Sequence, residues 1–231
     1  MINQGDVISY LDMCKEEGVN LQRGMNFRLR GGHSVILMSL RPGAPYADRI
    51  EEEGKILIYE GHDIPAQKQG PHPKTVDQPE RNPGGGLTQN GLFCRAALQY
   101  KDSKRAPELV KVYEKMRSGI WVFNGIFKLI DAWREKINNR RVFKFTLELI
   151  DEVISDSKES ISGIDHHRII PTSVKLTVWK RDKGACVKCG SKDNLHFDHI
   201  IPYSKGGSSL IADNIQLLCA RHNIAKRDKI E

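Results

Sequence analysis

The 231-residue sequence lacks three features that would set it apart from an ordinary folded protein. No stretch approaches the ~18 consecutive apolar residues that a membrane span needs. The N-terminal residues have neither the basic region nor the apolar run of a secretory signal, and there is no internal repeat. We therefore expect a cytoplasmic protein with no membrane partner. At this length, one large core or two modest ones can form, and two domains are expected.

Cysteine is scarce, with five residues in the chain, and in a cytosolic protein these are not expected to form disulfides. Cys14 and Cys94 each stand alone beside apolar residues, which is typical of small buried thiols. Cys186, Cys189 and Cys219 are different, because they lie near the C-terminal end at a spacing that suits metal ligands.

Acidic residues are outnumbered, which gives a net charge of +7 and a pI of about 9.1. The segment from Val174 to Glu231 holds eleven Lys and Arg against six Asp and Glu, so it alone carries +5. Such an excess favours a polyanionic partner such as DNA. A solvated basic face explains the charge on its own equally well.

The N-terminal part of the chain has a mostly β pattern. Ser34–Leu40 and Ile56–Tyr59 are short apolar runs that predict buried strands. Val142–Leu149 alternates apolar residues with polar ones such as Lys144 and predicts a half-buried strand, with the polar residues on its exposed face. Helices are predicted over residues 6–17, capped by Asp6 and ended by Gly18, and over Thr88–Tyr100.

Leu109–Lys115 predicts another strand, and Gly119–Trp133 predicts two strands or one bent strand. The long loop Ile64–Gly86 is of a kind that is usually functional or disordered. Residues 152–173 are polar and rich in Ser and Asp, and predict a linker. The predicted fold is therefore α+β: a curved β-sheet or barrel with flanking helices over residues 1–151, then a small module over 174–231.

The cysteines of this module form two pairs of metal ligands. Cys186 and Cys189 are one pair, and Cys219 and His222 follow after 29 intervening residues. Four such ligands complete a tetrahedron suited to Zn²⁺, which would be structural because no position stays open. Zinc binding would help to fold a module too small to be stable on a core alone.

Further polar residues lie between and beside the two pairs: Asp198-His199, Gly206-Gly207, Asn214, then Asn223 directly after His222, and Lys226. Together and in this order they resemble the HNH (ββα-metal) nuclease family over about residues 174–231. The motif departs from the family name, because its third position is Asn223 rather than histidine. An alternative makes His222 a ligand of the catalytic metal and leaves zinc with three cysteines.

The chemistry of phosphodiester hydrolysis fits these residues. His199 has a pKa near neutrality and is the candidate general base. Asp198 is a hard oxygen ligand of the kind that Mg²⁺ or Mn²⁺ takes, and Asn223 can complete that site because one helical position rotates by about 100° from His222. The resemblance implies that Asn214 orients the loop of His199. Lys226 is a candidate phosphate contact.

Residues from about Gly31 to Ile150 resemble the SRA (YDG) domain, which has a PUA-like fold, binds DNA and flips a modified cytosine into a pocket. The segments that carry the resemblance are Gly32–Leu37, Tyr46–Asp48, Ile58–Asp63, Leu87–Gly91, Val112–Lys115 and Gly119–Gly125. Two departures stand out: the segment after Tyr59 is less rich in Gly, and the spacing from Asp48 to Tyr59 is stretched.

The resemblance implies a pocket for the flipped base. Tyr46 and Tyr59 would sandwich its ring, and Asp48 would accept from the N4 amine of cytosine, with Asp63 in reserve. Asn90, at a helix start, would contact phosphate or fill the vacated base position. Tyr59 as a core aromatic and Asp48 as an exposed loop acid are the ordinary alternatives.

The sequence thus predicts a modification-dependent, type IV-like restriction endonuclease that acts on double-stranded DNA carrying 5-methylcytosine or 5-hydroxymethylcytosine. It would use structural Zn²⁺ and catalytic Mg²⁺ or Mn²⁺, with no organic cofactor. A double-strand break needs two nuclease sites, which favours a homodimer. Two alternatives remain: an HNH nuclease for unmodified or mismatched DNA with the N-terminal domain as a clamp, and a non-catalytic reader of DNA methylation.

Overall fold

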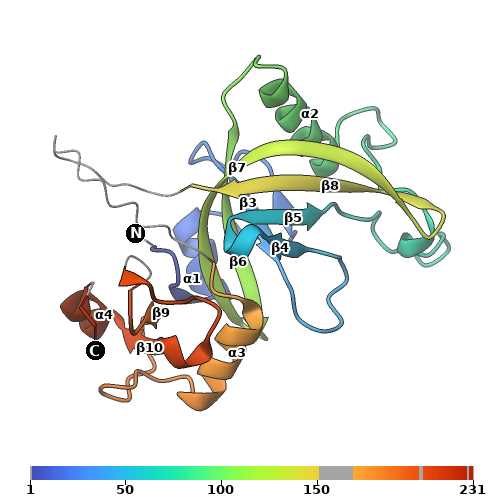
Figure 1. Cartoon of the computed structure of the whole chain (residues 1–231). Helices are drawn as coiled ribbons and strands as arrows, with labels where there is room; N and C mark the ends of the chain where they lie inside the picture. The colour runs from blue at the N-terminus through green and yellow to red at the C-terminus, as the bar shows by residue number, and fades with distance from the viewer. Residues whose placement is uncertain (1, 151–168, 203–204, 228, 231) are drawn as a thin grey trace.

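A large, strongly curved sheet forms the N-terminal part of the chain (Figure 1). The computed structural model describes residues 2–150, 169–202, 205–227 and 229–230, and confirms the α+β prediction. Within these residues the sheet has eight strands, seven of them in the order β2 (Met25–Asn26), β3 (Ser34–Met38), β6 (Glu108–Arg117), β7 (Ile120–Ile137), β8 (Arg140–Leu149), β5 (Ile56–Glu60) and β4 (Arg49–Glu51). The eighth, β1 (Val7–Ser9), pairs with β7. All pairs are antiparallel except β3 with β6.

Strand β7 explains the curvature of the sheet. Its register with β6 shifts between Val112 and Tyr113, and its register with β8 shifts between Leu129 and Asp131. Such bulges bend a strand and increase its twist. From Ile120 on, the segment predicted over Gly119–Trp133 therefore lies in one continuous bent strand, the second of the two predicted forms.

Helix α2 (Gln89–Lys101) covers the sheet and closes the core. Phe93 is fully buried and meets the ring of Phe145 edge-on, with the ring centroids 6.0 Å apart. The helix begins at Thr88, whose side chain accepts from the backbone N–H of Gly91. The helix predicted over Thr88–Tyr100 is thus confirmed.

The strand predicted over Val142–Leu149 is confirmed, but it is more than half buried. Its apolar side chains face the core as expected. Lys144, predicted on the exposed face, is only 1% exposed because its ammonium group lies 2.8 Å from the buried carboxylate of Glu60. Lys144 thus pairs with Glu60 where the alternating pattern predicted contact with water.

The helix predicted over residues 6–17 is too long at its start. Val7–Ser9 pairs with β7, and helix α1 covers only Tyr10–Glu17. Ser9, not Asp6, caps the helix by accepting from the N–H of Asp12. Gly18 ends the helix, as predicted.

The C-terminal module contains a short β-hairpin between two helices. Its elements are α3 (Thr172–Arg181), β9 (Leu195–His199), β10 (Ile215–Cys219) and α4 (Ala220–Lys226). Short 3₁₀ turns at Ala212–Asn214, and at Glu52–Gly54 and Pro73–Thr75 in the N-terminal domain, complete the described elements. No helix among the described residues is long and apolar enough to cross a bilayer.

The predicted linker, residues 152–173, lies outside the described residues as far as 168. Its last part is not a linker, because Ile169 and Ile170 are buried and α3 begins at Thr172. Ile169 packs into the core under the large sheet, whereas Ile170 packs with the C-terminal module. The chain is therefore anchored on both sides of this boundary.

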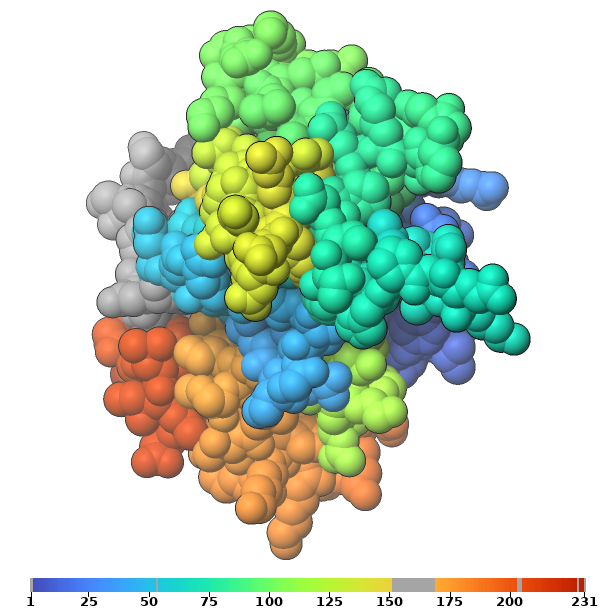
Figure 2. All heavy atoms as spheres, turned by 90° about the vertical axis from the view of Figure 1, so that its right-hand side faces the viewer, coloured from blue at the N-terminus to red at the C-terminus, as the bar shows by residue number. Residues whose placement is uncertain are grey.

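Three segments meet on one face of the N-terminal domain. Figure 2 shows the loop after β3 in light blue, the loop after β5 in teal and the tip of the β7–β8 hairpin in yellow. Lys74 donates to the carbonyl of Pro45, and the backbone N–H of Arg141 donates to Asp77 at 2.7 Å. The long loop Ile64–Gly86 is therefore held against its neighbours.

Candidate functional site

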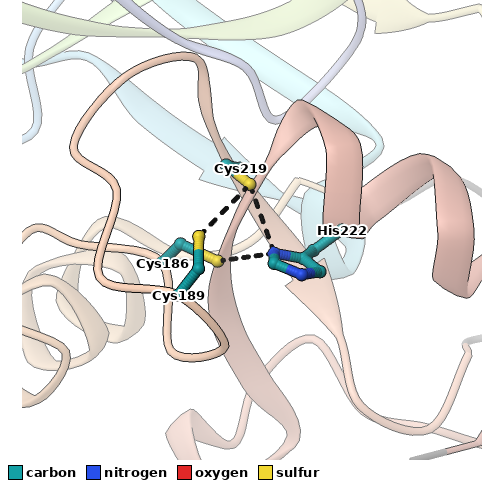
Figure 3. Close-up of side chains that lie close together, drawn as sticks. All are labelled: Cys186, Cys189, Cys219 and His222. Atoms are coloured by element: carbon teal, nitrogen blue, oxygen red, sulfur yellow. Dashed lines mark hydrogen bonds between the residues drawn. The ribbon is translucent and has the colours of Figure 1, made fainter.

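Four potential metal ligands converge at one end of the C-terminal hairpin (Figure 3). The ligand atoms of Cys186, Cys189, Cys219 and His222 all lie within 4.8 Å of one another. The sulfur atoms of Cys189 and Cys219 are 3.8 Å apart, and Nδ1 of His222 lies 3.3 Å from the sulfur of Cys219. A tetrahedral zinc with bonds of about 2.3 Å to sulfur has edges of about 3.8 Å, so the residues fit Zn²⁺.

Local backbone structure places each ligand. The segment after Cys186 folds back so that Gly190 donates to the carbonyl of Cys186 at 2.8 Å. Cys219 ends β10, and His222 lies in the first turn of α4. Burial opposes ionisation of the Cys186 thiol, but backbone hydrogen bonds from Cys219, Lys188 and Cys189 prevail and lower its pKa to about 6. The thiolate is the form that binds metal.

The hairpin presents the predicted catalytic pair in adjacent positions. His199 lies opposite Ile215, and Asp198 lies opposite Gln216. Nε2 of Gln216 lies 3.5 Å from a carboxylate oxygen of Asp198. Alternation along β9 gives the two side chains different surroundings: Asp198 meets α4, and His199 meets the loop before β10.

The ring of His199 is held by a buried hydroxyl. Its Nε2 lies 2.8 Å from Oγ of Ser209. Asn214 clamps the same loop, because its side chain accepts from the N–H of Ile201 at 2.8 Å and donates to the carbonyls of Ile201 and Ser208. This geometry agrees with the predicted role of Asn214 as a residue that orients the loop and not as a metal ligand.

Gly207 explains the Gly-Gly part of the motif. A Cβ atom at this position would lie 1.8 Å from the carbonyl oxygen of Ile201 and 2.7 Å from Nδ2 of Asn214. No side chain fits there without displacing the backbone that Asn214 holds. The glycine therefore allows the loop after His199 to close.

Lys226 does not have the predicted role. Its side chain is 1% exposed, and its ammonium group lies 3.0 Å from the carboxylate of Asp198 and 2.6 Å from the carbonyl oxygen of His199. It fixes the strand that carries the catalytic pair and is not placed to contact a phosphate. The physical reason is the short α4, whose inner face packs directly on β9.

Asn223 directly follows His222 in α4, and one helical position rotates the side-chain direction by about 100°. His222 points to the three cysteines. The structure thus favours His222 as a zinc ligand over the alternative that gave it to the catalytic metal.

Asp198 and Asn223 supply hard oxygen donors suited to a divalent ion. Mg²⁺ and Mn²⁺ take few protein ligands and keep several waters, so two donors beside the candidate base fit such an ion. Among the described residues, the three cysteines with His222 form the one gathering of three or more His, Cys, Asp or Glu ligands. The catalytic ion would therefore depend on Asp198, Asn223 and its substrate.

A second cluster of predicted residues gathers in the N-terminal domain. The rings of Tyr46 and His62 are stacked, with centroids 5.2 Å apart and planes at 17°. Nζ of Lys74 lies 4.2 Å from the centroid of the Tyr46 ring. Burial lowers the pKa of His62 to about 4, so its ring is neutral at pH 7.

Tyr59 belongs to the core and not to a stacking surface. It is 1% exposed, packs with the residues under α2, and its hydroxyl lies 3.0 Å from Nε2 of His62. The predicted sandwich of Tyr46 and Tyr59 is therefore corrected: His62 lies beside Tyr46, and Tyr59 supports His62 from below. The apolar pattern of β5 explains why Tyr59 points inward.

The carboxyl group of Asp48 lies between two strands. One oxygen accepts from the N–H of Glu60 at 3.0 Å, and the other lies 3.4 Å from the N–H of Ser39. Desolvation raises the pKa of Asp48 to about 7, against the lowering effect of these hydrogen bonds. Asp63, the reserve, is already paired with Lys74 and Arg140 at 2.9 and 2.6 Å.

Asn90 is turned inward and away from solvent. It is 2% exposed, and its side chain accepts from the N–H of His62 and donates to the carbonyls of His62 and Pro79. The predicted phosphate or base contact is therefore corrected to a positioning role for His62. Gly61 makes this possible, because a Cβ atom there would lie 2.7 Å from Oδ1 of Asn90.

Buried charges fasten the loop that carries Tyr46 and Asp48. Glu60 accepts from the N–H of Ala47 at 3.2 Å and pairs with Lys144. Lys144 also donates to the carbonyl of Ala47, and Arg140 lies 3.4 Å from Glu60. The loop is therefore tied to β5 and β8, so Asp48 keeps its place between Ser39 and Glu60.

Three residues near these sites had no assigned role in the sequence: His62, Ser209 and Gln216. His62 lies inside a segment that carries the SRA resemblance, but its position two residues after the end of β5 gave no sign of stacking. Ser209 and Gln216 have no sequence signal at all. Their roles depend on the loop closure and on the hairpin register.

The zinc cluster gives a direct prediction. We expect about one tightly held zinc per chain by plasma mass spectrometry. Cys186→Ser should abolish zinc retention and expose the C-terminal module to limited proteolysis, because ligation helps to fold so small a unit. Cys94→Ser is the matched control and should keep its zinc. A folded, protease-resistant module without zinc would contradict the prediction.

Part of the C-terminal module matches a known protein family. Residues 186–229 match a family model described as HNH endonuclease. No curated protein sequence matches the chain. The crystal structure of the SRA domain of SUVH5 bound to fully hydroxymethylated CG DNA is similar over 65% of this chain and 91% of that chain, with 22% identity and a TM-score of 0.46.

Two restriction enzymes are similar over 98% of this chain. The modification-dependent TagI restriction endonuclease has 19% identity, a TM-score of 0.40 and 78% of its chain covered. The type IV phosphorothioation-dependent restriction endonuclease ScoMcrA has 14% identity, a TM-score of 0.43 and 57% of its chain covered. With TM-scores below 0.5, these neighbours leave the function of this chain to be argued from its own side chains. Residues 186–229 are thus similar to the HNH endonuclease family, and the four candidate zinc ligands lie within this segment.

Proposed function

We propose that this chain is a modification-dependent DNA endonuclease. In the proposal, the N-terminal domain holds a modified cytosine flipped out of duplex DNA, and the HNH module hydrolyses the backbone nearby. The observation that carries the nuclease part is the arrangement of Asp198, His199 and Asn223 on a hairpin and helix fastened by four zinc ligands. A reader without catalysis needs none of these three.

In the proposed mechanism His199 takes the proton of the attacking water. Its ring is steadied by Ser209, and the loop that supplies Ser209 is closed by Asn214. Lys226 donates to the backbone carbonyl of His199 and so fixes the position of this general base on β9. A divalent ion at Asp198 and Asn223 would supply positive charge to the phosphate oxygens.

The proposed reader uses Tyr46 and His62 as its aromatic surface. Flipping costs a few kcal/mol of stacking, which aromatic contact and hydrogen bonds to the base edge offset. The two rings stack on each other at 5.2 Å, so the base takes the place of one of these contacts. His62 is neutral at pH 7, which suits it to stack without attracting phosphate.

Asp48 is the proposed reader of the base edge. With a pKa of about 7 its carboxyl group is neutral in a large fraction of molecules at physiological pH. A neutral acid can donate to N3 of cytosine and accept from the N4 amine, whereas a carboxylate can only accept. The 5-methyl or 5-hydroxymethyl group of the base is then the mark that the surrounding surface distinguishes. Two nuclease sites, and so two copies of the chain, are proposed for a double-strand break.

The role of His199 is tested by His199→Ala. Loss of a general base lowers rates by about 10²–10⁴-fold, so cleavage of a modified plasmid should fall by that range. Binding of a modified duplex, measured by fluorescence anisotropy without divalent ions, should stay unchanged. His72→Ala, which changes an exposed histidine of the N-terminal domain just before the turn Pro73–Thr75, is the control. Cleavage at the normal rate by His199→Ala would remove this assignment.

The role of Asp48 is tested by the pH dependence of binding. The neutral acid predominates below about pH 7, so the preference for modified over unmodified duplex should weaken as pH rises from about 6 to 8. Asp48→Asn keeps one donor and one acceptor and should show a preference that is flat with pH. The same slope in the wild type and in Asp48→Asn would show that another group reads the base.

A further inference from the structure

The start of the chain forms a strap between the two domains. On one side, the backbone N–H of Gly5 donates to the carbonyl of Phe123 in β7 at 2.8 Å, and the N–H of Phe123 donates to the backbone carbonyl of Asp6. On the other side, the N–H of Phe197 in β9 donates to the carbonyl of Gly5 at 3.1 Å. Backbone hydrogen bonding thus runs from the large sheet through residues 5–6 to the nuclease hairpin.

A side-chain contact reinforces this strap. Asp6 lies opposite His196 in an antiparallel bridge, and its carboxylate is 2.8 Å from Nδ1 of His196. His196 shares a face of β9 with Asp198. The strap therefore holds the same strand that carries the catalytic pair.

A second contact buries a charge between the domains. Lys175 of α3 is 1% exposed and Glu114 of β6 is 0% exposed, and the ammonium group lies 2.7 Å from the carboxylate. The ammonium group also donates to Asn124 of β7 at 2.6 Å, and Thr172 donates to the other oxygen of Glu114. Asn124 donates to Glu114 at 3.0 Å and completes the network.

Apolar packing surrounds this buried pair. Met116 and Val122 of the large sheet share one buried cluster with side chains from α3 and from both strands of the hairpin, including Val178, Phe197 and Leu217. Figure 1 shows α3 and the hairpin lying below the ends of β6 and β7. A buried ammonium group without its partner is costly, so any placement of the two domains that separates Lys175 from Glu114 is penalised.

We propose that the nuclease module is docked on the reader at one fixed placement, and that this dock sets the distance from the recognised base to the cut phosphodiester bond. Lys175 and Asp6 are positioning residues for this purpose: neither touches the reacting atoms, and both fix β9 and α3 relative to the large sheet. The inference rests on the proposed function, because it requires a bound modified base and a cut nearby.

The first test maps cut positions in end-labelled duplexes that carry one modified cytosine, 5-methyl or 5-hydroxymethyl, whichever supports cleavage. The mark is moved stepwise along a fixed sequence. We expect the wild type to cut each strand at one offset from the mark, or at adjacent bonds, and the cut to move with the mark. Cuts scattered at many distances would overturn the dock while leaving modification dependence intact. Cutting that ignores the mark would overturn the proposed function itself.

The second test separates a dock from a tether. Gly-Ser residues inserted between residues 152 and 168 lengthen the chain between the domains without touching either contact. A docked module should keep the wild-type offset. A shifted or broadened offset would overturn the proposal.

The third test loosens the dock itself. Lys175→Met leaves Glu114 buried without its partner, so the share of cuts at the main position should fall several-fold. Adding Glu114→Gln removes the orphaned charge and should restore the narrow offset, a rescue that a general loss of stability would not show. Lys180→Met, an exposed change on the same helix, should leave the offset unchanged.

Asp6→Ala provides an independent variant that removes one partly exposed side chain, with Glu16→Ala as its control. Asp6→Ala should broaden the offset, and it provides the test if Lys175→Met is too unstable to purify. A wild-type offset in both Asp6→Ala and a folded Lys175→Met would overturn the assignment of these residues.

Discussion

The tetrahedral gathering of Cys186, Cys189, Cys219 and His222 is the constraint on which the nuclease depends. The module has a small apolar core, and the segments that carry Cys186 and Cys189, Cys219 and His222 converge at these ligands. His222 fixes the first turn of α4 at the ligand cluster, and Lys226, the last residue of this helix, reaches the strand that carries Asp198 and His199. In the proposed function, the structural zinc site thereby holds the catalytic residues in place.

Buried charges do comparable work elsewhere in the chain. Glu60 with Lys144 and Arg140 fastens the loop of Tyr46 and Asp48, and Glu114 with Lys175 fixes the nuclease to the large sheet. Such pairs contribute little net stability, because desolvation offsets their attraction. They do penalise every arrangement that separates the partners. We infer that in this protein their main effect is to specify position, both within the reader and between the two domains.

The sequence predicted what depends on local pattern. The ligand spacing and the helix begun by Thr88 follow from residue order, and both are found. Residue order also predicted strand structure over Gly119–Trp133 but left two forms open, of which the single bent strand is found from Ile120 on. It failed where a distant partner decides. Asp6 was predicted to cap a helix but pairs with His196. Lys144 was predicted on an exposed face and Lys226 at a phosphate, but each is buried against a carboxylate. Tyr59 and Asn90 had suitable chemistry for DNA, yet Tyr59 packs in the core and Asn90 hydrogen-bonds to the backbone of His62. Loop closure and sheet register bring these partners together, and neither can be predicted from the short sequence pattern around each residue.

The most direct measurement is digestion of matched plasmids by the wild-type protein. One plasmid carries unmodified cytosine, and the others carry 5-methylcytosine or 5-hydroxymethylcytosine at the same positions, with Mg²⁺ and Mn²⁺ supplied in turn. The account predicts cleavage of at least one modified plasmid, only with a divalent ion, and little cleavage of the unmodified one. Equal cleavage of all the plasmids would contradict a reader that selects modified cytosine.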